Sequence, residues 1–374
     1  MRILVLNAGS STLKASVLDT PRREPVATET VDWGADATKA EDRDAGVQDL
    51  LGRLVVSGVP IGSIEAVGHR VVHGGPRFHE PVLVDDAIIA DLDALTALAP
   101  LHNPVAIETI RVARRAVPDV PHVACFDTAF HAMLEPVAYR YPVPDQWFVE
   151  WGVRRYGFHG LSVAWSVRRA GELLDRDPVS LRLVVAHLGS GCSVTAVDGS
   201  RSVATSMGMT PLEGLMMGTR AGSIDPGIML GLLQDGHRTT DELAEDLDHR
   251  SGLLAIGGTS DMRALLDAAD GGDDKASLAI EMFVRRAGEG IAAAATNLPA
   301  LDALVFTGGI GEHAGSIRVG IVQRLALLGI ASVPADDTDD DARLSPAGAS
   351  PAVLRIAARE DVIVAEATAR LAEG

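Results

Sequence analysis

The chain has 374 residues, of which 47% are hydrophobic and only 4% aromatic, so its core must be built from aliphatic side chains. Its formal net charge of −18 argues against nucleic acid or an anionic membrane surface as a partner, because both attract proteins through basic surface. The first apolar run ends at Asn7, too early for a signal peptide, and we expect a cytoplasmic protein of about two domains.

The first half of the chain alternates predicted strands and helices, which is typical of an α/β protein. Strands are predicted near residues 2–7, 11–19, 26–33, 64–73 and 121–127, and helices near 41–57, 85–98 and 104–116. The last helix should start with Asn103 as its N-cap and Pro104 as its first residue. The stretch 130–158 is rich in proline and aromatic residues, so we expect it to be irregular.

The second half continues the same alternation. It predicts helices near 160–175, 226–234, 239–249, 276–297, 315–327 and 364–373, and strands near 181–187, 192–198, 201–206 and 353–357. A further buried strand leads into the glycine-rich stretch 308–315, which we expect to form a loop. The acidic segment 334–343 is expected to be a solvated surface loop without a chemical role.

Two similar strand–turn–strand patterns lie almost half a chain apart. The first reads Asn7-x-Gly9-Ser10 and the second His187-x-Gly189-Ser190, at an offset of 180 residues. One such turn alone would indicate only a β-hairpin. Two of them predict two related lobes, each with a turn whose backbone N–H groups can bind phosphate oxygens.

Four polar residues stand where a ligand could reach them. Arg70 and Arg220 lie among glycines, and a guanidinium matches the planar fork of a carboxylate or phosphate. Asp127 follows a predicted strand, and His159 precedes a predicted helix. Each arginine taken alone could form a surface ion pair instead. With the two turns, the four residues predict an anion site built at loop positions.

Other sites are disfavoured by spacing. The chain has no G-x-x-x-x-G-K-[ST] motif, and the glycines of 308–315 do not match the G-x-G-x-x-G dinucleotide fingerprint. His69 and His73 lie on a predicted strand, about 13 Å apart at roughly 3.3 Å per residue, too far to share one zinc ion.

Longer stretches identify a family. The chain closely resembles the acetokinase family, within the actin, Hsp70 and sugar-kinase superfamily, over nearly its whole length. The resemblance rests on "LVLNAGSSTLK", "GHRVVHGG", "LAPLHNP", "FDTAFH", "YGFHG", "VVAHLGSGCSVTAVDG", "MTPLEGLMMGTR", "DMR", "FTGGIGE" and "REDVIVA". It implies reversible phosphoryl transfer from ATP to acetate, giving ADP and acetyl phosphate, with Mg²⁺ or alternatively Mn²⁺, by a homodimer.

The resemblance also implies the architecture. It implies an α/β fold of two duplicated actin/Hsp70-like (ribonuclease H-like) lobes, with mixed sheets flanked by helices and the active site in the cleft between the lobes. The N-terminal lobe is expected to comprise residues 1–131 plus 363–374, and the nucleotide-binding C-terminal lobe residues 132–362.

Matching motif positions carry the family's site residues onto this chain. The resemblance assigns catalysis to Asp127, His159 and Arg220. It assigns acyl-substrate binding to Arg70, Val72, Leu101, His102, Phe158 and Pro211. It assigns the nucleotide to Lys14, His187, Leu188, Gly189, Ser190, Gly191, Asp261, Met262, Arg263, Gly309, Ile310, Gly311, Glu312 and His313. It assigns the metal ion to Asn7 and Glu360. The chain departs from the family pattern at Leu161, Val163, Ser190, Ser223 and His313.

The chemistry suits these residue types. The acceptor is a carboxylate, which is ionised at neutral pH, so we expect Asp127 to orient an arginine or a metal-bound water rather than remove a proton. Propionate or another short-chain acid is the alternative substrate. A nucleotide-binding regulatory or chaperone-like ATPase is the alternative of another class. Arg70, His159 and Arg220 favour a kinase over that alternative, because a nucleotide switch needs no second anion site.

Overall fold

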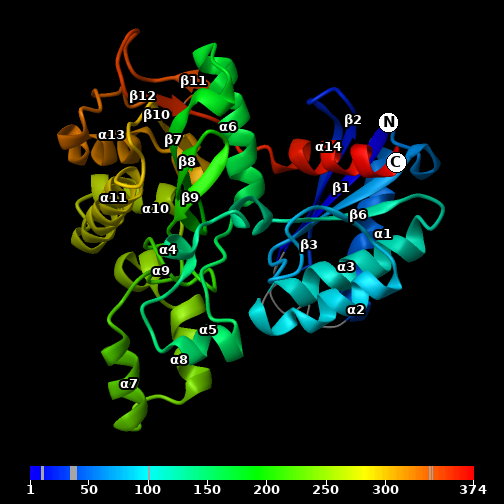
Figure 1. Cartoon of the computed structure of the whole chain (residues 1–374), viewed down its shortest axis with the longest axis horizontal. Coiled ribbons are helices and arrows are strands. Elements are labelled where there is room, and N and C mark those ends of the chain that lie inside the picture. The colour runs from blue at the N-terminus through cyan, green and yellow to red at the C-terminus, as the bar shows by residue number, and fades with distance from the viewer. Residues whose placement is uncertain (10–11, 34–39, 100–101, 337, 339) are drawn as a thin grey trace. The chain divides into compact units, whose positions relative to one another are not determined.

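Each half of the chain folds around a mixed sheet of six strands (Figure 1). The structure, a computed structural model, describes residues 1–9, 12–33, 40–99, 102–336, 338 and 340–374. One unit comprises Met1–Ala132, Phe158–Leu161 and Arg359–Gly374, and the other Met133–Gly157 and Ser162–Ala358. Within the described ranges, no helix is long and apolar enough to span a membrane.

The first sheet has the strand order β3-β2-β1-β4-β6-β5. Its strands are β1 (Arg2–Ala8), β2 (Thr12–Asp19), β3 (Pro25–Asp32), β4 (Ala66–Val71), β5 (Val82–Leu83) and β6 (His122–Phe126). Its helices are α1 (Ala40–Val56), α2 (Asp86–Ala94), α3 (Asn103–Ala116) and α14 (Glu360–Ala372). β6 is buried along its whole length, as expected for an inner strand covered on both faces.

Neighbouring residues of β4 show which helices cover which face. Val67 shares an apolar cluster with residues of α1 and α3, whereas a Cβ at Gly68 would lie within 2.6 Å of Val364 and Thr368 of α14. Successive side chains of a strand point to opposite faces, so α14 packs on the face opposite to α1 and α3. Only glycine allows α14 to approach β4 this closely.

The second sheet has the order β11-β12-β10-β7-β8-β9. Its strands are β7 (Arg182–Leu188), β8 (Cys192–Asp198), β9 (Arg201–Thr205), β10 (Ala303–Thr307), β11 (Ala342–Arg343) and β12 (Ala352–Arg355). The helices of this half are α4 (Pro136–Tyr139), α5 (Asp145–Trp151), α6 (Gly160–Leu174), α7 (Pro226–Gln234), α8 (Thr240–His249), α9 (Gly252–Gly257), α10 (Met262–Asp270), α11 (Asp274–Ala295), α12 (Gly308–His313) and α13 (Gly315–Arg324). Short 3₁₀ helices cover Ile61–Ser63, Thr96–Leu98, Ala129–His131, Pro178–Ser180 and Ala326–Leu328.

The two sheets repeat one design. In each, the first strand pairs antiparallel with the second and parallel with the fourth. The fourth then pairs parallel with the last strand, which carries a two-residue antiparallel edge strand. β1 therefore corresponds to β7, and β4 to β10. The predicted fold class, with two duplicated lobes of mixed sheets flanked by helices, is confirmed.

Some predicted elements differ from those observed. β5, β11, α9 and α10 were not predicted, and the stretch 130–158 contains α4 and α5 although we expected it to be irregular. The glycine-rich stretch after β10 forms the short helix α12 rather than a loop. The last helix begins at Glu360, four residues before its predicted start, and α2 ends at Ala94 before a separate 3₁₀ turn.

Asn103 and the acidic segment also behave differently from the prediction. Asn103 does not cap α3, since its buried amide accepts from the His73 N–H and donates to the His73 carbonyl. The carbonyls of Asp336 and Asp340 accept hydrogen bonds from Arg355, which is 1% exposed. Buried arginine thus fixes described parts of the 334–343 segment, which is not simply a solvated loop.

Candidate active site

A cavity of about 700 Å³ opens in the second unit, within the size range of small-molecule sites. It is bordered by the turn after β7, the start of α10 and the start of α12. Eight residues assigned to the nucleotide line it: Gly189, Ser190, Asp261, Met262, Arg263, Gly309, Ile310 and His313. Stretches that are far apart in the sequence are therefore brought together around one space large enough for a nucleotide.

The parallel pairing of β7 and β10 brings the turn after β7 next to the glycine-rich start of α12. His187 and Thr307 are partners in register, so the segments that follow both strands are neighbours. A Cβ at Gly189 would lie 3.5 Å from the Gly191 carbonyl oxygen, 3.7 Å from the backbone nitrogen of Gly309 and 3.8 Å from Nε2 of His187. The space beside Gly309 is open, and a backbone nitrogen at a helix start suits phosphate oxygens.

Four other residues assigned to the nucleotide lie near these turns but do not line the cavity. Leu188 is fully buried at the end of β7, and Gly311 is buried in α12. Glu312 accepts a hydrogen bond from the Ala358 N–H at 3.0 Å. Gly191 accepts a hydrogen bond from the Gly189 N–H and so shapes the turn. Their assignment to the nucleotide stays a prediction.

Arg220 is a half-buried cation in the second unit. Its NH1 donates to the Pro211 carbonyl at 3.0 Å, and burial lowers its pKa, an effect that the charge of Asp248 opposes. Within the described part of the chain, no carboxylate forms an ion pair with it. Burying a charge is unfavourable without a partner, so an anionic ligand would relieve this position.

Arg70 has the opposite surroundings, in the first unit. It lies inside strand β4, within the strand predicted at 64–73, and so not at a loop position. Its Nε and NH2 donate to the two carboxylate oxygens of Asp127 at 2.9 and 2.6 Å, and its NH1 lies 3.1 Å from Glu360. Burial pulls the pKa of Arg70 down, but the two carboxylates outweigh it and leave the pKa raised. Asp127 is 1% exposed and orients this guanidinium.

Oxygen atoms gather around Arg70. The Asn7 Oδ1 accepts from the Arg70 NH1 at 3.3 Å, and Lys14 lies opposite Asn7 in the antiparallel register of β1 and β2. Burial raises the pKa of Glu360 to about 7, against the pull of Arg70 and with the help of Asp127. The cluster thus presents an amide oxygen and carboxylate oxygens close together.

His159 stands immediately before α6 with an unusual backbone. Its φ is 58°, a left-handed conformation that few residues other than glycine adopt. The Gly160 N–H donates to the Asp127 carbonyl at 2.9 Å, and a Cβ at Gly160 would lie only 2.1 Å from that oxygen. The end of β6 therefore holds His159 in this conformation, which is the kind of strain found at functional sites.

The residues assigned to the acyl group are placed as follows. Phe158 is 1% exposed and meets the ring of His73 edge to face, with centroids 5.4 Å apart. Val72 is half-buried just after β4, and His102 is the residue before α3. Pro211 belongs to the second unit, where its carbonyl holds Arg220. Leu101 lies outside the described residues.

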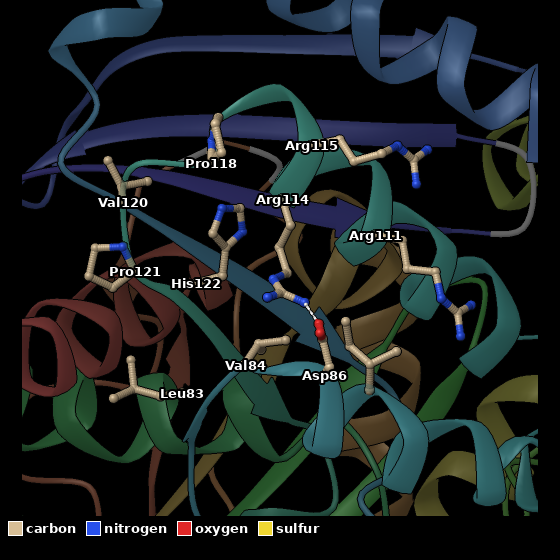
Figure 2. Close-up of a pocket in the computed structure, with 11 residues that line it drawn as sticks. Leu83, Val84, Asp86, Arg111, Arg114, Arg115, Pro118, Val120, Pro121 and His122 are labelled. Carbon is tan, nitrogen blue, oxygen red and sulfur yellow. Dashed lines mark hydrogen bonds and ion pairs between the residues drawn. The ribbon is translucent and has the colours of Figure 1, made fainter.

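A second cavity, of about 620 Å³, lies in the first unit and is lined partly by Arg111, Arg114 and Arg115 (Figure 2). Each arginine forms an ion pair with a carboxylate: Arg111 with Asp93 and Glu108, Arg114 with Asp86, and Arg115 with Asp44. Four carboxylates facing three arginines leave no excess positive charge. This cavity therefore lacks the property that a phosphate site requires.

Sequence reasoning missed three hydroxyl-bearing residues of the second unit. Ser260 and Ser316 line the nucleotide-sized cavity, and Ser162 is bonded to His187. Serine is common in loops and at helix starts, so its presence alone carries little information. Ser223 was noted only as a departure from the family, and its hydroxyl accepts from the Gly214 N–H at 3.1 Å, which supports the loop that precedes Arg220.

Comparison with known proteins gives one consistent result. The model of the acetokinase family matches residues 2–366. Acetate kinase of Deinococcus deserti is 45% identical over 88% of this chain and 86% of its own. The solved structures include a propionate kinase of Francisella tularensis, at 35% identity and a TM-score of 0.89, and acetate kinase of Porphyromonas gingivalis, at 30% and 0.89. Each covers 99% of this chain and is itself covered to 99%.

The match spans both sheets and every site segment described above, and these relatives are kinases. The chain therefore belongs to the acetokinase family.

Proposed function

We propose that this chain transfers a phosphoryl group reversibly between ATP and acetate, forming ADP and acetyl phosphate. The observation that carries the proposal is the cavity of about 700 Å³ between the turn after β7 and the starts of α10 and α12, since it offers a nucleotide room and lies beside the backbone nitrogen of Gly309. The identity to acetate kinases supports acetate as the acceptor.

The transfer needs no proton removal. As an oxygen of the acetate carboxylate bonds to the γ-phosphorus, the bond from that phosphorus to the bridging oxygen breaks and ADP leaves. Arg220 neutralises charge that develops on the phosphoryl group. Asp127 keeps the Arg70 guanidinium in place through two hydrogen bonds. His159 supplies a further polar group in the conformation fixed by Gly160.

We further propose that Mg²⁺ binds at Asn7 and Glu360. Among the described side chains, no three histidine, cysteine or acidic groups gather as a metal cluster. Mg²⁺ does not require one, because it prefers oxygen ligands and usually keeps water and substrate phosphates in its shell. The amide oxygen of Asn7 and the carboxylate of Glu360 fit that preference. When bound, the ion neutralises charge on the ATP phosphates.

The activity is tested by trapping the acyl phosphate with hydroxylamine. Purified protein, MgATP and acetate should give acetohydroxamate, and propionate and butyrate are assayed in parallel. A higher kcat/KM for propionate than for acetate would favour propionate as the substrate. ATP hydrolysis that no acid stimulates, without hydroxamate, would contradict the proposal and favour an ATPase.

Substrate size is expected to depend on Val72. Val72→Ala should raise kcat/KM for propionate relative to acetate about tenfold, since one methylene in an apolar pocket is worth about 1–3 kcal/mol. Steady-state kinetics with both acids measure the ratio. An unchanged ratio would remove Val72 from the acyl pocket.

We also propose that the protein is a homodimer whose interface includes α7. This helix reads PGIMLGLLQ, yet none of its residues is buried, and Ile228 and Leu230 are 53% and 58% exposed. Apolar helices normally bury a stripe, and an exposed apolar patch marks an interaction surface. Val149 and Trp151 of α5, in the same unit, are exposed as well.

Leu230→Glu is therefore expected to convert the dimer into a monomer, because a carboxylate would be buried without a partner at the interface. Sedimentation equilibrium measures the mass. Leu327→Glu is the matched control, since Leu327 is 96% exposed but lies in the 3₁₀ turn after α13. A dimer that survives Leu230→Glu, or is lost equally with Leu327→Glu, contradicts an interface at α7.

A further inference from the structure

A polar group behind the phosphate turn of the second sheet has no assigned role. The Ser162 Oγ lies 2.8 Å from Nδ1 of His187, and Ser162 is fully buried in the first turn of α6. The opposite edge of the ring faces the turn, since Nε2 is 3.8 Å from the Cβ position of Gly189. The imidazole therefore lies between the buried hydroxyl of Ser162 and the turn beside Gly309.

The first sheet contains a polar group in the corresponding place. In the first sheet, Asn7 and Arg70 are partners in register on β1 and β4, and Glu360 reaches them from the first turn of α14. In the second sheet, the corresponding strand positions are those of His187 and Thr307. Ser162 reaches His187 from the first turn of α6. In both sheets, polar side chains therefore meet at corresponding positions, and they come from three corresponding elements: the first strand, the fourth strand and the start of a helix.

The second group consists of His187, Ser162 and Thr307, where the first contains an arginine and a carboxylate. Thr307 is fully buried, and its hydroxyl has no hydrogen-bond partner among the described residues. Since partners in a parallel register share a face of the sheet, Thr307 lies on the side of the sheet that His187 faces. Thr307 also immediately precedes α12, so its hydroxyl stands at the start of that helix.

We infer that Ser162 is a positioning residue that selects the tautomer of His187. The Ser162 hydroxyl donates a hydrogen bond to Nδ1, so the neutral ring carries its own proton on Nε2. An ionised phosphate can only accept hydrogen bonds, so this tautomer lets His187 donate to it. The inference rests on the proposed function for the identity of the phosphate, which belongs to the nucleotide.

The link is tested by nitrogen NMR of the imidazole rings in the intact protein. The wild-type spectrum should show His187 with its proton on Nε2, assigned by the signals that vanish in His187→Asn. Ser162→Ala should shift the ring toward a mixture of both tautomers. Calorimetric titration with MgADP should show affinity weakened about threefold to tenfold, which is the loss of one hydrogen bond.

Ser166→Ala is the matched control. Ser166 is also fully buried and lies one turn further along α6, but its hydroxyl has no partner among the described residues. This variant should keep both the wild-type tautomer and the wild-type affinity for MgADP. Equal weakening in both variants would mean that packing, not tautomer selection, sets the affinity, and the inference would fail.

The remaining outcomes are also decisive. If Ser162→Ala keeps the Nε2 proton and binds MgADP normally, Ser162 does not position the ring. If the wild-type protein binds no MgADP, the proposed function is wrong, and the NMR comparison of the two serine variants still decides whether Ser162 sets the tautomer. If the wild-type protein binds MgADP but forms no hydroxamate, only the acyl-transfer part of the proposed function is contradicted.

Discussion

Arg220→Ala is expected to lower kcat by about 10³-fold and to change KM for ATP little, on the precedent of arginines that stabilise transferring phosphoryl groups. An interaction made mainly in the transition state appears in kcat, whereas one made equally in the ground state appears in KM. Arg220 is suited to the first role because it is half-buried and has no ion-pair partner among the described residues. Steady-state kinetics with both substrates measure the effect.

Two further variants sharpen this test. Arg220→Lys should recover little activity, because a point charge does not reproduce the guanidinium fork. Arg250→Ala removes an exposed arginine of the same unit and should leave kcat unchanged. Circular dichroism and thermal melting check that each variant folds. A folded Arg220→Ala enzyme with near-normal kcat would show that other groups meet the phosphoryl charge.

Arg70→Ala should both impair catalysis and destabilise the first unit. It leaves Asp127 and Glu360 facing each other as buried carboxylates without their common partner, and breaking such a buried pair costs about 3–5 kcal/mol of unfolding free energy. We also expect a higher KM for acetate and a lower kcat. Urea unfolding and steady-state kinetics measure the two effects.

The double variant Arg70→Ala/Asp127→Asn separates charge from packing. Removing one carboxylate should restore part of the lost unfolding free energy but none of the activity. Arg53→Ala breaks an exposed pair with Asp49 in the same unit and should change stability little. If Arg70→Ala is no less stable than Arg53→Ala, the ion pairs of Arg70 with Asp127 and Glu360 do not stabilise the first unit.

The turn after β7 could be predicted because its signal is local. Glycine must follow the strand directly if the backbone is to approach a ligand, so Gly189 is visible in the sequence, whereas the first predicted turn, Asn7-x-Gly9-Ser10, runs into residues outside the described ranges. The long inner strands were predictable for a similar reason, since β6 and β10 are continuous apolar runs. β5 and β11 are two residues long and too short to show any periodicity.

The partners of the site residues could not be predicted in the same way. Glu360 meets Arg70 only because α14 returns to the first sheet, and the sequence near either residue does not indicate this. Ser162 acts through His187, which lies on strand β7 of the second sheet, 25 residues further along the chain. Arg70 was counted among ligand-accessible loop positions because glycines lie near it, although it falls within the strand predicted at 64–73. Gly68 admits α14 and does not make a turn.

The return of α14 has a consequence for synthesis on the ribosome. Chains emerge from the N-terminus and domains commonly begin to fold in that order. β1 and β4 emerge early, but the helix that covers one of their faces, Glu360–Ala372, is made only after every strand of the second sheet. The first sheet therefore keeps one face without its helix while the whole second sheet is being synthesised.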